Sequence, residues 1–336
     1  MKRQHSSKFF LLIATKVNTN EKCLCIIIDY IYIKIMKKII ILGGPTASGK
    51  SKFALKLAEK VNGEIINADS MQIYKYFSIL TSQPKKNDYK LIPHHLYGYI
   101  DVNIKYNAIK WLADAKIKIK NILNKKKTPI VVGGSGLYLE FLCEGVNNMP
   151  KISINTKNKV KLLLGNIDDL ELLNLIKKVD HAYSLKINIA DKLRISKLLE
   201  VYFETKKNIT YFHSKSKKTN NYQYFKVLIS PDKEKIKLNI EKRFYDMFAE
   251  GLLTELKKNK DKVKNCNIEN AIGFKELSSF IENKITMEEA TALVIKKTKG
   301  FAKRQYTWFD NRFEQNIKVS GQDNLSLVVE TFHKII

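Results

Sequence analysis

The sequence has little cysteine and no long apolar run. The 336 residues include four cysteines, Cys23, Cys25, Cys143 and Cys266. They form no C-x-x-C pair and no Cys/His set at zinc spacing, which excludes a disulfide framework or a structural zinc site and indicates a reducing compartment. The strongest apolar run, residues 24–35, is too short to cross a bilayer and is interrupted by Asp29 and Lys34. We therefore expect no membrane association.

Acidic residues are also scarce, which leaves a strongly basic chain. Lys and Arg number 60 against 33 Asp and Glu, giving a net charge of +27. Such a charge favours a polyanionic partner, because binding releases counterions from it. Lysine is abundant along the whole chain, so part of the charge reflects composition. The length suits one large or two smaller domains, and we expect a monomer.

The first 35 residues do not match the rest of the chain. Met36 comes immediately before a strand-like run, so we expect Met36 to be the natural start and residues 1–35 to be an extension outside the native fold. The expected location is then the cytoplasm. A mitochondrial presequence is the alternative: Lys2 and Arg3 fit one, whereas the acidic Glu21 does not.

The strongest local motif follows this start. An apolar run, Ile39 to Leu42, leads into a match to G-x-x-x-x-G-K-[ST], and an amphipathic helical pattern comes next. The motif consists of Gly44, Pro45, Thr46, Ala47, Ser48, Gly49, Lys50 and Ser51. Backbone N–H groups of such a loop form an anion site, Lys50 adds a charge, and the Ser51 hydroxyl can ligate Mg²⁺. The alternative is an ordinary glycine-rich turn.

A second strand pattern, residues 63–68, ends at Asp69. The carboxyl ends of parallel strands share one edge of a sheet, where ligands bind. Asp69 is therefore expected near the phosphate loop. The alternative is that Asp69 caps the helix that would follow, and the two roles are compatible.

A third apolar strand, residues 128–132, ends in Gly133-Gly134-Ser135-Gly136 and not in an acidic residue. Ordinary phosphate-loop ATPases carry an acidic residue at this kind of position for their metal. The glycine-rich ending therefore weighs against routine nucleotide hydrolysis.

The remaining pattern divides the chain. Met149-Pro150 marks a break, and residues 149–221 show helical patterns without strands. A strand pattern resumes at 224–229, followed by one long helix over 233–258. We expect an α/β fold with a P-loop NTPase-like parallel sheet flanked by helices. Its two parts, residues 36–148 and 222–336, are separated by a small inserted helical domain at 149–221.

Basic and aromatic residues alternate in the segment 296–313, KKTKGFAKRQYTWFDNRF. Such segments hold phosphates and stack on bases, which predicts contact with nucleic acid. The alternative is an amphipathic helix whose Phe301, Trp308 and Phe309 belong to the core.

Taken together, these stretches resemble the tRNA dimethylallyltransferases, also called tRNA isopentenyltransferases, of bacterial type. The matching segments are GGPTASGKS at 43–51, NADSMQIY at 67–74, LTSQP at 80–84, PHHL at 93–96, PIVVGGSGLYL at 129–139, RISKLLEVY at 194–202, AIGFKEL at 271–277 and KKTKGFAKRQYTWF at 296–309. They occur in the family's order. We expect no C-terminal zinc-finger extension, which resembles the bacterial members more than the eukaryotic ones.

The resemblance implies a reaction. Dimethylallyl diphosphate gives its prenyl group to N6 of adenosine 37 in the tRNA anticodon stem-loop, and diphosphate leaves. The phosphate loop would hold the leaving diphosphate, with Mg²⁺ as cofactor, and Thr46 and Lys50 would act in catalysis. Asp69 matches the family's general base. Because adenine N6 is a poor nucleophile, a carboxylate that takes its proton would help the attack.

The resemblance also implies contacts to tRNA. Residues at two places would touch it: Asp69, Ser70, Met71, Gln72 and Ser135 near the loop, and Lys157, Leu193, Arg194, Ile195, Ser196 and Lys197 in the inserted domain. Ser135 replaces a usual Thr and keeps the hydroxyl. Lys157 and Lys197 replace usual arginines, which keeps the charge but loses bidentate geometry.

Three other functions compete with this one. A phosphate-loop small-molecule kinase would leave the helical insert and the segment 296–313 without a role. A prenyltransferase acting on free adenine nucleotides would share the loop and Asp69 but would need no insert to bind tRNA. An RNA-binding module whose loop senses nucleotide gives Asp69 no role.

Overall fold

The structure is a computed structural model that describes residues 37–214, 222–263 and 265–335. The expectations about residues 1–35 and Met36 lie outside this range. The described chain divides into two compact units. The core unit comprises residues 37–143 and 222–335, and the helical unit comprises residues 144–214. Among the described residues, no helix is both long and apolar enough to cross a membrane.

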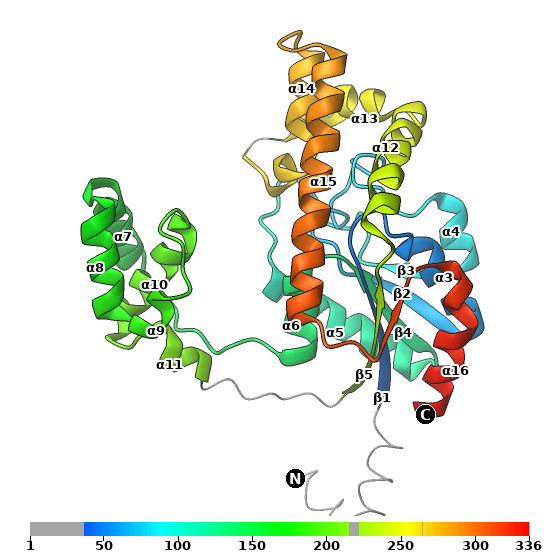
Figure 1. Ribbon diagram of the computed structural model, residues 1–336, viewed down its shortest axis with the longest axis horizontal. Helices are drawn as coiled ribbons and strands as arrows, with labels where there is room; N and C mark the ends of the chain where they lie inside the picture. The colour runs from blue at the N-terminus through cyan, green and yellow to red at the C-terminus, as the bar shows by residue number, and fades with distance from the viewer. Residues whose placement is uncertain (1–36, 215–221, 264, 336) are drawn as a thin grey trace, which may run out of the picture. The chain divides into compact units, whose positions relative to one another are not determined.

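A six-stranded sheet in the order β3-β2-β4-β1-β5-β6 forms the centre of the core unit, and every pairing in it is parallel. The strands are β1 (Lys37–Gly43), β2 (Gly63–Asn67), β3 (His94–His95), β4 (Thr128–Gly133), β5 (Tyr222–Ile229) and β6 (Ile317–Val319). Figure 1 shows the strands fanning through the core unit with helices packed around them. The expected fold class is confirmed.

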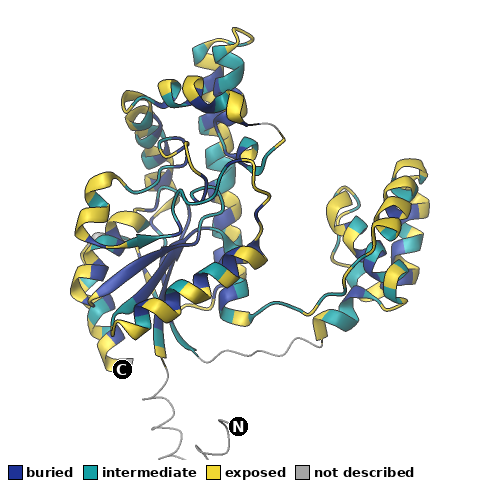
Figure 2. Ribbon diagram, turned by 180° about the vertical axis from the view of Figure 1, so that it is seen from behind, coloured by how far each residue is buried: buried dark blue, intermediate teal, exposed yellow. Residues whose placement is uncertain are grey.

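The strands that form the middle of the sheet are apolar without alternation, as expected for strands covered on both faces. Ile40 in β1 pairs with Ile130 in β4 on one side and with Phe225 in β5 on the other, and all three are buried. Figure 2 shows this as a dark blue centre under a mixed surface. The register brings the carboxyl ends of β1, β2 and β4 to one edge, because Gly43 pairs with Gly133 and Asn67 with Val132.

The helices of the core unit follow its strands. They are α3 (Lys50–Lys60), α4 (Lys86–Leu91), α5 (Ala108–Asn124), α6 (Gly136–Glu144), α12 (Lys233–Ala249), α13 (Leu252–Asn259), α14 (Phe274–Ile281), α15 (Met287–Arg312) and α16 (Leu325–Ile335). The segment 296–313 thus lies almost wholly within α15, the longest of them.

One expectation about the core unit is wrong in detail, and one helix was not anticipated. The single helix expected over 233–258 is two helices, because Gly251 adopts a left-handed conformation with φ of 98° and ends the first. The chain also continues beyond the segment 296–313 into β6 and α16. Val328 and Phe332 of α16 pack into the core beside α3, although no clear pattern predicted this helix.

The helical unit has its own hydrophobic core. Its helices are α7 (Ile154–Asn166), α8 (Asp169–Val179), α9 (His181–Ser184), α10 (Lys192–Thr205) and α11 (Ile209–Ser214). Val160, Ile176 and Leu198 are fully buried in this core. Asp180, also buried, accepts hydrogen bonds from the backbone of Tyr183 and Thr210 and so joins α9 to α11. The unit therefore has the buried core and the internal bonds of a separate module.

Candidate active site

The phosphate loop connects β1 to α3 through two glycines that no other residue could replace easily. A Cβ on Gly44 would lie 2.4 Å from the carbonyl oxygen of Ile229, so the loop passes directly against the end of β5. Gly49 has φ of 86° and begins α3. Gly44 and Lys50 are thereby fixed on either side of a tight turn, as the motif predicts.

One hydrogen bond from α12 and one within the motif hold the loop. The Asn239 side chain on α12 donates to the Ala47 carbonyl at 3.0 Å, and Ala47 has φ of 59°. The ammonium of Lys50 donates to the Pro45 carbonyl at 2.5 Å. The Ser48 hydroxyl is buried and has no hydrogen-bond partner within the described chain.

The charges beside the loop act on one another. Burial lowers the pKa of Lys50 to about 7, with Asp69 raising it and Arg243 lowering it further. Burial also lowers the pKa of Arg243, and Asp69 opposes that shift. Two desolvated cations and one carboxylate therefore line this place, an arrangement suited to an anionic ligand.

The Asp69 segment leaves the end of β2 in a fixed turn. Asn67 accepts a hydrogen bond from the Asp69 backbone at 2.8 Å, and its amide donates to the Asp69 carbonyl at 3.0 Å. One carboxylate oxygen of Asp69 accepts from the backbone N–H of Met71 at 2.9 Å. Asp69 thus caps a turn, and no helix begins there. The carboxylate still lines the cavities described below, so the capping and the functional role coexist.

The second glycine turn packs against the Asp69 segment. A Cβ on Gly133 would lie 2.0 Å from the Ala68 carbonyl oxygen, which leaves room for glycine alone. The Ser135 hydroxyl accepts from the backbone N–H of Ser70 at 3.0 Å. The end of β4 is therefore in direct contact with the residues around Asp69.

Helix α15 closes this edge of the sheet. The buried side chain of Gln305 accepts from the backbone N–H of Thr46 at 2.7 Å and donates to the Gly134 carbonyl at 2.9 Å. A Cβ on Gly136 would lie 2.3 Å from the Trp308 ring, and one on Gly43 would lie 2.6 Å from the Phe309 ring. A further set of α15 side chains, Thr298, Phe301 and Arg304, lines the cavity next to it.

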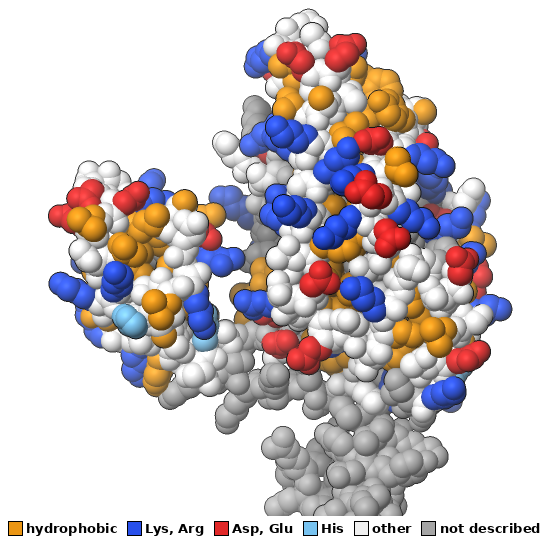
Figure 3. All heavy atoms as spheres, in the orientation of Figure 1, with side chains coloured by type: hydrophobic (Ala, Val, Ile, Leu, Met, Phe, Trp, Pro, Cys, Tyr) orange, Lys and Arg blue, Asp and Glu red, His pale blue; other side chains and the backbone are white. Residues whose placement is uncertain are grey.

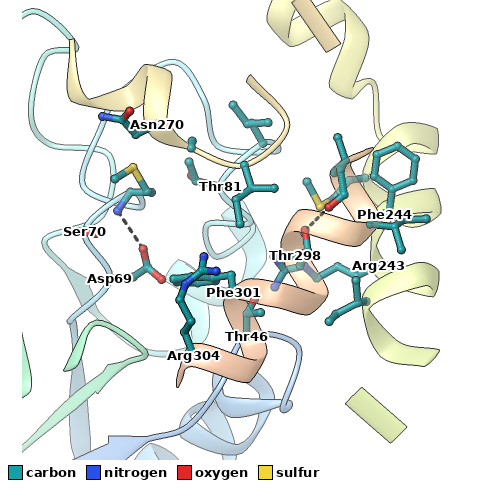
Figure 4. Close-up of a pocket in the computed structure, with 18 residues that line it drawn as sticks. Thr46, Asp69, Ser70, Thr81, Arg243, Phe244, Asn270, Thr298, Phe301 and Arg304 are labelled. Carbon is teal, nitrogen blue, oxygen red and sulfur yellow. Dashed lines mark hydrogen bonds between the residues drawn. The ribbon is translucent and has the colours of Figure 1, made fainter. Parts of the chain in front are cut away.

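Two cavities meet at Asp69. One, of about 390 Å³, follows the phosphate loop and includes Lys50 and Gln305 in its wall. The other, of about 330 Å³, has a largely apolar wall with Phe244 and Phe301. The residues common to both walls are Thr46, Asp69, Thr81 and Arg243. Figure 4 shows Asp69 from the end of β2, Arg243 from α12 and Arg304 from α15 around the second cavity. A ligand divided between them would have its polar part and its apolar part joined beside Asp69.

The structure places most, but not all, of the predicted loop residues at the first cavity. Six line it, namely Thr46, Ala47, Ser48, Gly49, Lys50 and Ser51. Gly44 and Pro45, at the start of the motif, are buried and do not line this cavity. Ser70 and Met71 line the second cavity, and Gln72 lines the first. Ser135 lines neither cavity, and its hydroxyl accepts a hydrogen bond from the Ser70 backbone.

The other predicted tRNA contacts lie in the helical unit. Lys157 on α7 and Leu193, Arg194 and Lys197 on α10 are exposed, and Leu193 is 86% exposed. Ser196 donates to Glu200. Ile195 is fully buried in the helical core, so its side chain is not accessible to a ligand, because helical periodicity turns one residue of a five-residue stretch inward.

Sequence reasoning missed several residues of the site, among them Arg243 and Gln305. Arg243 lies one turn after Asn239 on α12, and these two polar side chains run beside the buried row of Ile236, Ile240 and Phe244. This polar row was the only available signal for Arg243. Gln305 belongs to a segment whose basic and aromatic residues drew the interpretation toward nucleic acid.

The residues at the loop fit a magnesium ion. Ser51 and Asp69 offer hard oxygen ligands at the first cavity, and Mg²⁺ takes few protein ligands because it keeps its waters and binds substrate phosphates. Within the described chain, no group of three or more His, Cys, Asp or Glu could hold a metal by itself. Any magnesium at this place would thus depend on ligands from a bound phosphate.

Comparison with known proteins agrees with this geometry. The family model described as IPP transferase matches residues 72–312. A tRNA dimethylallyltransferase from Pelagibacter ubique is 40% identical over 84% of this chain and 91% of its own. The chain belongs to the IPP transferase family, which includes the tRNA dimethylallyltransferases.

Solved structures of the family share the fold. A tRNA isopentenylpyrophosphate transferase from Staphylococcus epidermidis is 30% identical with a TM-score of 0.64, covering 89% of this chain and 99% of its own. A eukaryotic dimethylallyltransferase whose structures are described as acting on tRNA reaches a TM-score of 0.72 at 26% identity, over 88% of this chain and 77% of its own.

Proposed function

We propose that this family member transfers a dimethylallyl group from dimethylallyl diphosphate to N6 of adenosine 37 in tRNA and releases diphosphate. One observation carries the proposal: a cationic cavity at the phosphate loop and a mostly apolar cavity share a wall at Asp69. The donor combines a diphosphate with a short hydrocarbon, and the bond to be broken lies between them.

In the proposed reaction, the bond from the allylic carbon to the diphosphate oxygen breaks and a bond from that carbon to adenine N6 forms. N6 loses one proton, which the Asp69 carboxylate accepts, and the electron pair of the broken bond leaves with diphosphate. The carboxylate is already oriented by Met71 N–H through one oxygen, so the other oxygen is the candidate acceptor. A proton acceptor of this kind contributes about 10²- to 10⁴-fold in rate.

Leaving-group stabilisation falls to the loop and α12. Lys50 and Arg243 supply positive charge at the first cavity, and Thr46 lies in the wall common to both cavities. Fixed charges in a desolvated site stabilise a developing anion more than water does. A magnesium ion bound by Ser51 and by the phosphates would neutralise further charge on the departing group.

The helical unit is proposed to bind tRNA. Its exposed Lys157, Arg194 and Lys197 supply cations for the phosphate backbone. Figure 3 shows Lys and Arg side chains interspersed with Asp and Glu side chains on each unit, so the basic residues are not gathered in a single patch in this view. Monomeric state and cytoplasmic location remain part of the proposal.

The test uses labelled dimethylallyl diphosphate with Mg²⁺ in four parallel reactions: with a tRNA transcript carrying adenosine 37, with the same transcript carrying guanosine 37, with AMP, and with ATP but no prenyl acceptor. We expect label only on the first. Label on AMP alone would support a free-nucleotide prenyltransferase, and ADP formed from ATP without label would support a phosphate-loop enzyme that transfers the γ-phosphoryl group of ATP to water or to another acceptor. Either result, or equal labelling of both transcripts, would contradict the proposal.

A further inference from the structure

The side chain of Gln305 is the one polar group of α15 that is buried against both glycine turns. It is 6% exposed, and its amide uses both ends: the oxygen accepts from Thr46 N–H and the nitrogen donates to the Gly134 carbonyl. The residues it joins are 259 and 171 positions away in sequence. A side chain bonded in two directions to two backbones fixes the distance between them.

The bond to Thr46 changes what the loop offers to a ligand. The N–H of Thr46 is committed to Gln305, so this amide is not one of those that bind phosphate. Because Gln305 fixes the Thr46 backbone, it also restricts the position of the Thr46 side chain. Since Thr46 lies in the wall common to both cavities, its placement matters for the reacting bond.

The bond to Gly134 continues toward Asp69. Gly134 is followed by Ser135, whose hydroxyl accepts from Ser70 N–H at 3.0 Å, directly after Asp69. Three hydrogen bonds therefore connect the phosphate loop, α15, the second glycine turn and the Asp69 segment in one series.

Close packing fixes the same helix against both turns. Trp308 covers Gly136 and Phe309 covers Gly43, each at a place where a Cβ would collide with the ring. The hydrogen bonds of Gln305 and these two aromatic contacts together set the position of α15 along the edge of the sheet. The helix therefore has little freedom to slide relative to the loop.

We propose that Gln305 is a positioning residue for prenyl transfer: it holds the Thr46 hydroxyl and the Asp69 segment at the separation that the reaction needs. The inference rests on the proposed function. Gln305, in the stretch KRQYTWF, thus positions other residues of the site and does not contact nucleic acid. Misplacement of reacting groups by about 1 Å can lower a rate about 10²-fold.

Two variants test it. Gln305→Leu keeps the volume and removes both hydrogen bonds, and Gln305→Glu keeps an acceptor for Thr46 N–H but turns an oxygen toward the Gly134 carbonyl. For both, we expect kcat per folded molecule, at saturating donor and tRNA, to fall about 10- to 100-fold. The dissociation constant for tRNA should stay within about twofold of the wild type. In Gln305→Leu, the Thr46 amide should also exchange its hydrogen faster.

The matched control is Val328→Ala, a buried change on α16 at a residue that lines neither cavity. It should lower the melting temperature and leave kcat per folded molecule unchanged. Wild-type kcat in both Gln305 variants, or a loss of kcat in the control equal to theirs, would overturn the inference while the proposed function stands. Absence of transfer by the wild type would overturn both.

Discussion

The core unit and the helical unit hold their predicted functional residues in opposite ways. In the core unit, Thr46 is fixed by a hydrogen bond to Gln305 on α15, and Asp69 is held in its own turn by hydrogen bonds with Asn67 and Met71. The neighbouring Gly133 packs so closely on Ala68 that a Cβ would collide there. In the helical unit, Lys157 and Leu193 are exposed, and Arg194 pairs with Asp191 in its own first turn. Chemistry at one bond requires fixed groups, whereas attraction to a long polyanion requires accessible charge.

The largest expected effect is the loss of Asp69. We expect Asp69→Ala to lower the single-turnover rate about 10²- to 10⁴-fold, because the proton of adenine N6 then has no acceptor. Affinity for tRNA should change little. Asp69→Asn, which keeps the shape, serves as the matched variant. A rate for either variant within threefold of the wild type would remove Asp69 as the base.

Glycine-to-alanine substitutions in the two units should change the free energy of unfolding in opposite directions. Gly133→Ala places a Cβ against the Ala68 carbonyl, and we expect a loss of about 1–3 kcal/mol in the free energy of unfolding. Gly165 on α7 of the helical unit has no atom within 4 Å of an added Cβ. Gly165→Ala should therefore stabilise the protein by about 0.5–1 kcal/mol, since alanine is the better helix former. Denaturant unfolding of the two variants measures this, and equal effects would contradict it.

A smaller effect concerns pH. Burial lowers the pKa of Lys50 to about 7, so its ammonium is charged below that pH and neutral above it in the free protein. A diphosphate needs the charged form, and we expect its affinity to fall by up to about tenfold for each pH unit above 7. Dividing the wild-type affinity for diphosphate by that of Lys50→Met at each pH removes the effect of the ligand's own titration. A ratio that is constant from pH 6 to 9 would contradict this pKa.

The smallest effect on function lies in the helical unit. Arg194→Ala should weaken tRNA binding several-fold and reduce the slope of log affinity against log salt by about 1, because one phosphate contact is lost. Lys157→Ala should behave similarly. Ile195→Ala, by contrast, creates a cavity in the helical core and should lower stability by about 2–5 kcal/mol. An unchanged salt slope for Arg194→Ala would count against a phosphate contact there.

Sequence reasoning reached the parts of the site that have local signals. The strand, glycine loop and helix around Lys50 are adjacent in sequence, and the shared edge of a parallel sheet placed Asp69 and Ser135 near them. Gln305 and Arg243 have no local signal of this kind, since their partners are far away in the chain. The end of α12 at Gly251 was missed because the helical pattern continues on both sides of it.

The interpretation of residues 296–313 was divided between RNA contact and core. The structure shows why neither alternative alone describes it. Phe309 is buried, as the core alternative required, and Lys303 is exposed. Phe301 and Arg304 line the second cavity. One face of the helix packs against the glycine turns and another face borders the cavity. The sequence alone does not show which residues belong to which face's partner, because that depends on how the helix packs in the fold.

The most direct test compares Asp69→Ala with Arg194→Ala in single-turnover transfer of labelled dimethylallyl to tRNA, with the tRNA concentration raised to saturation. We predict that saturation restores the Arg194 variant to the wild-type rate, while the Asp69 variant stays about 10²- to 10⁴-fold slower at any concentration. An Arg194 variant that stays slow at saturation, or an Asp69 variant that recovers, would contradict the division between a fixed reacting site and an accessible binding unit.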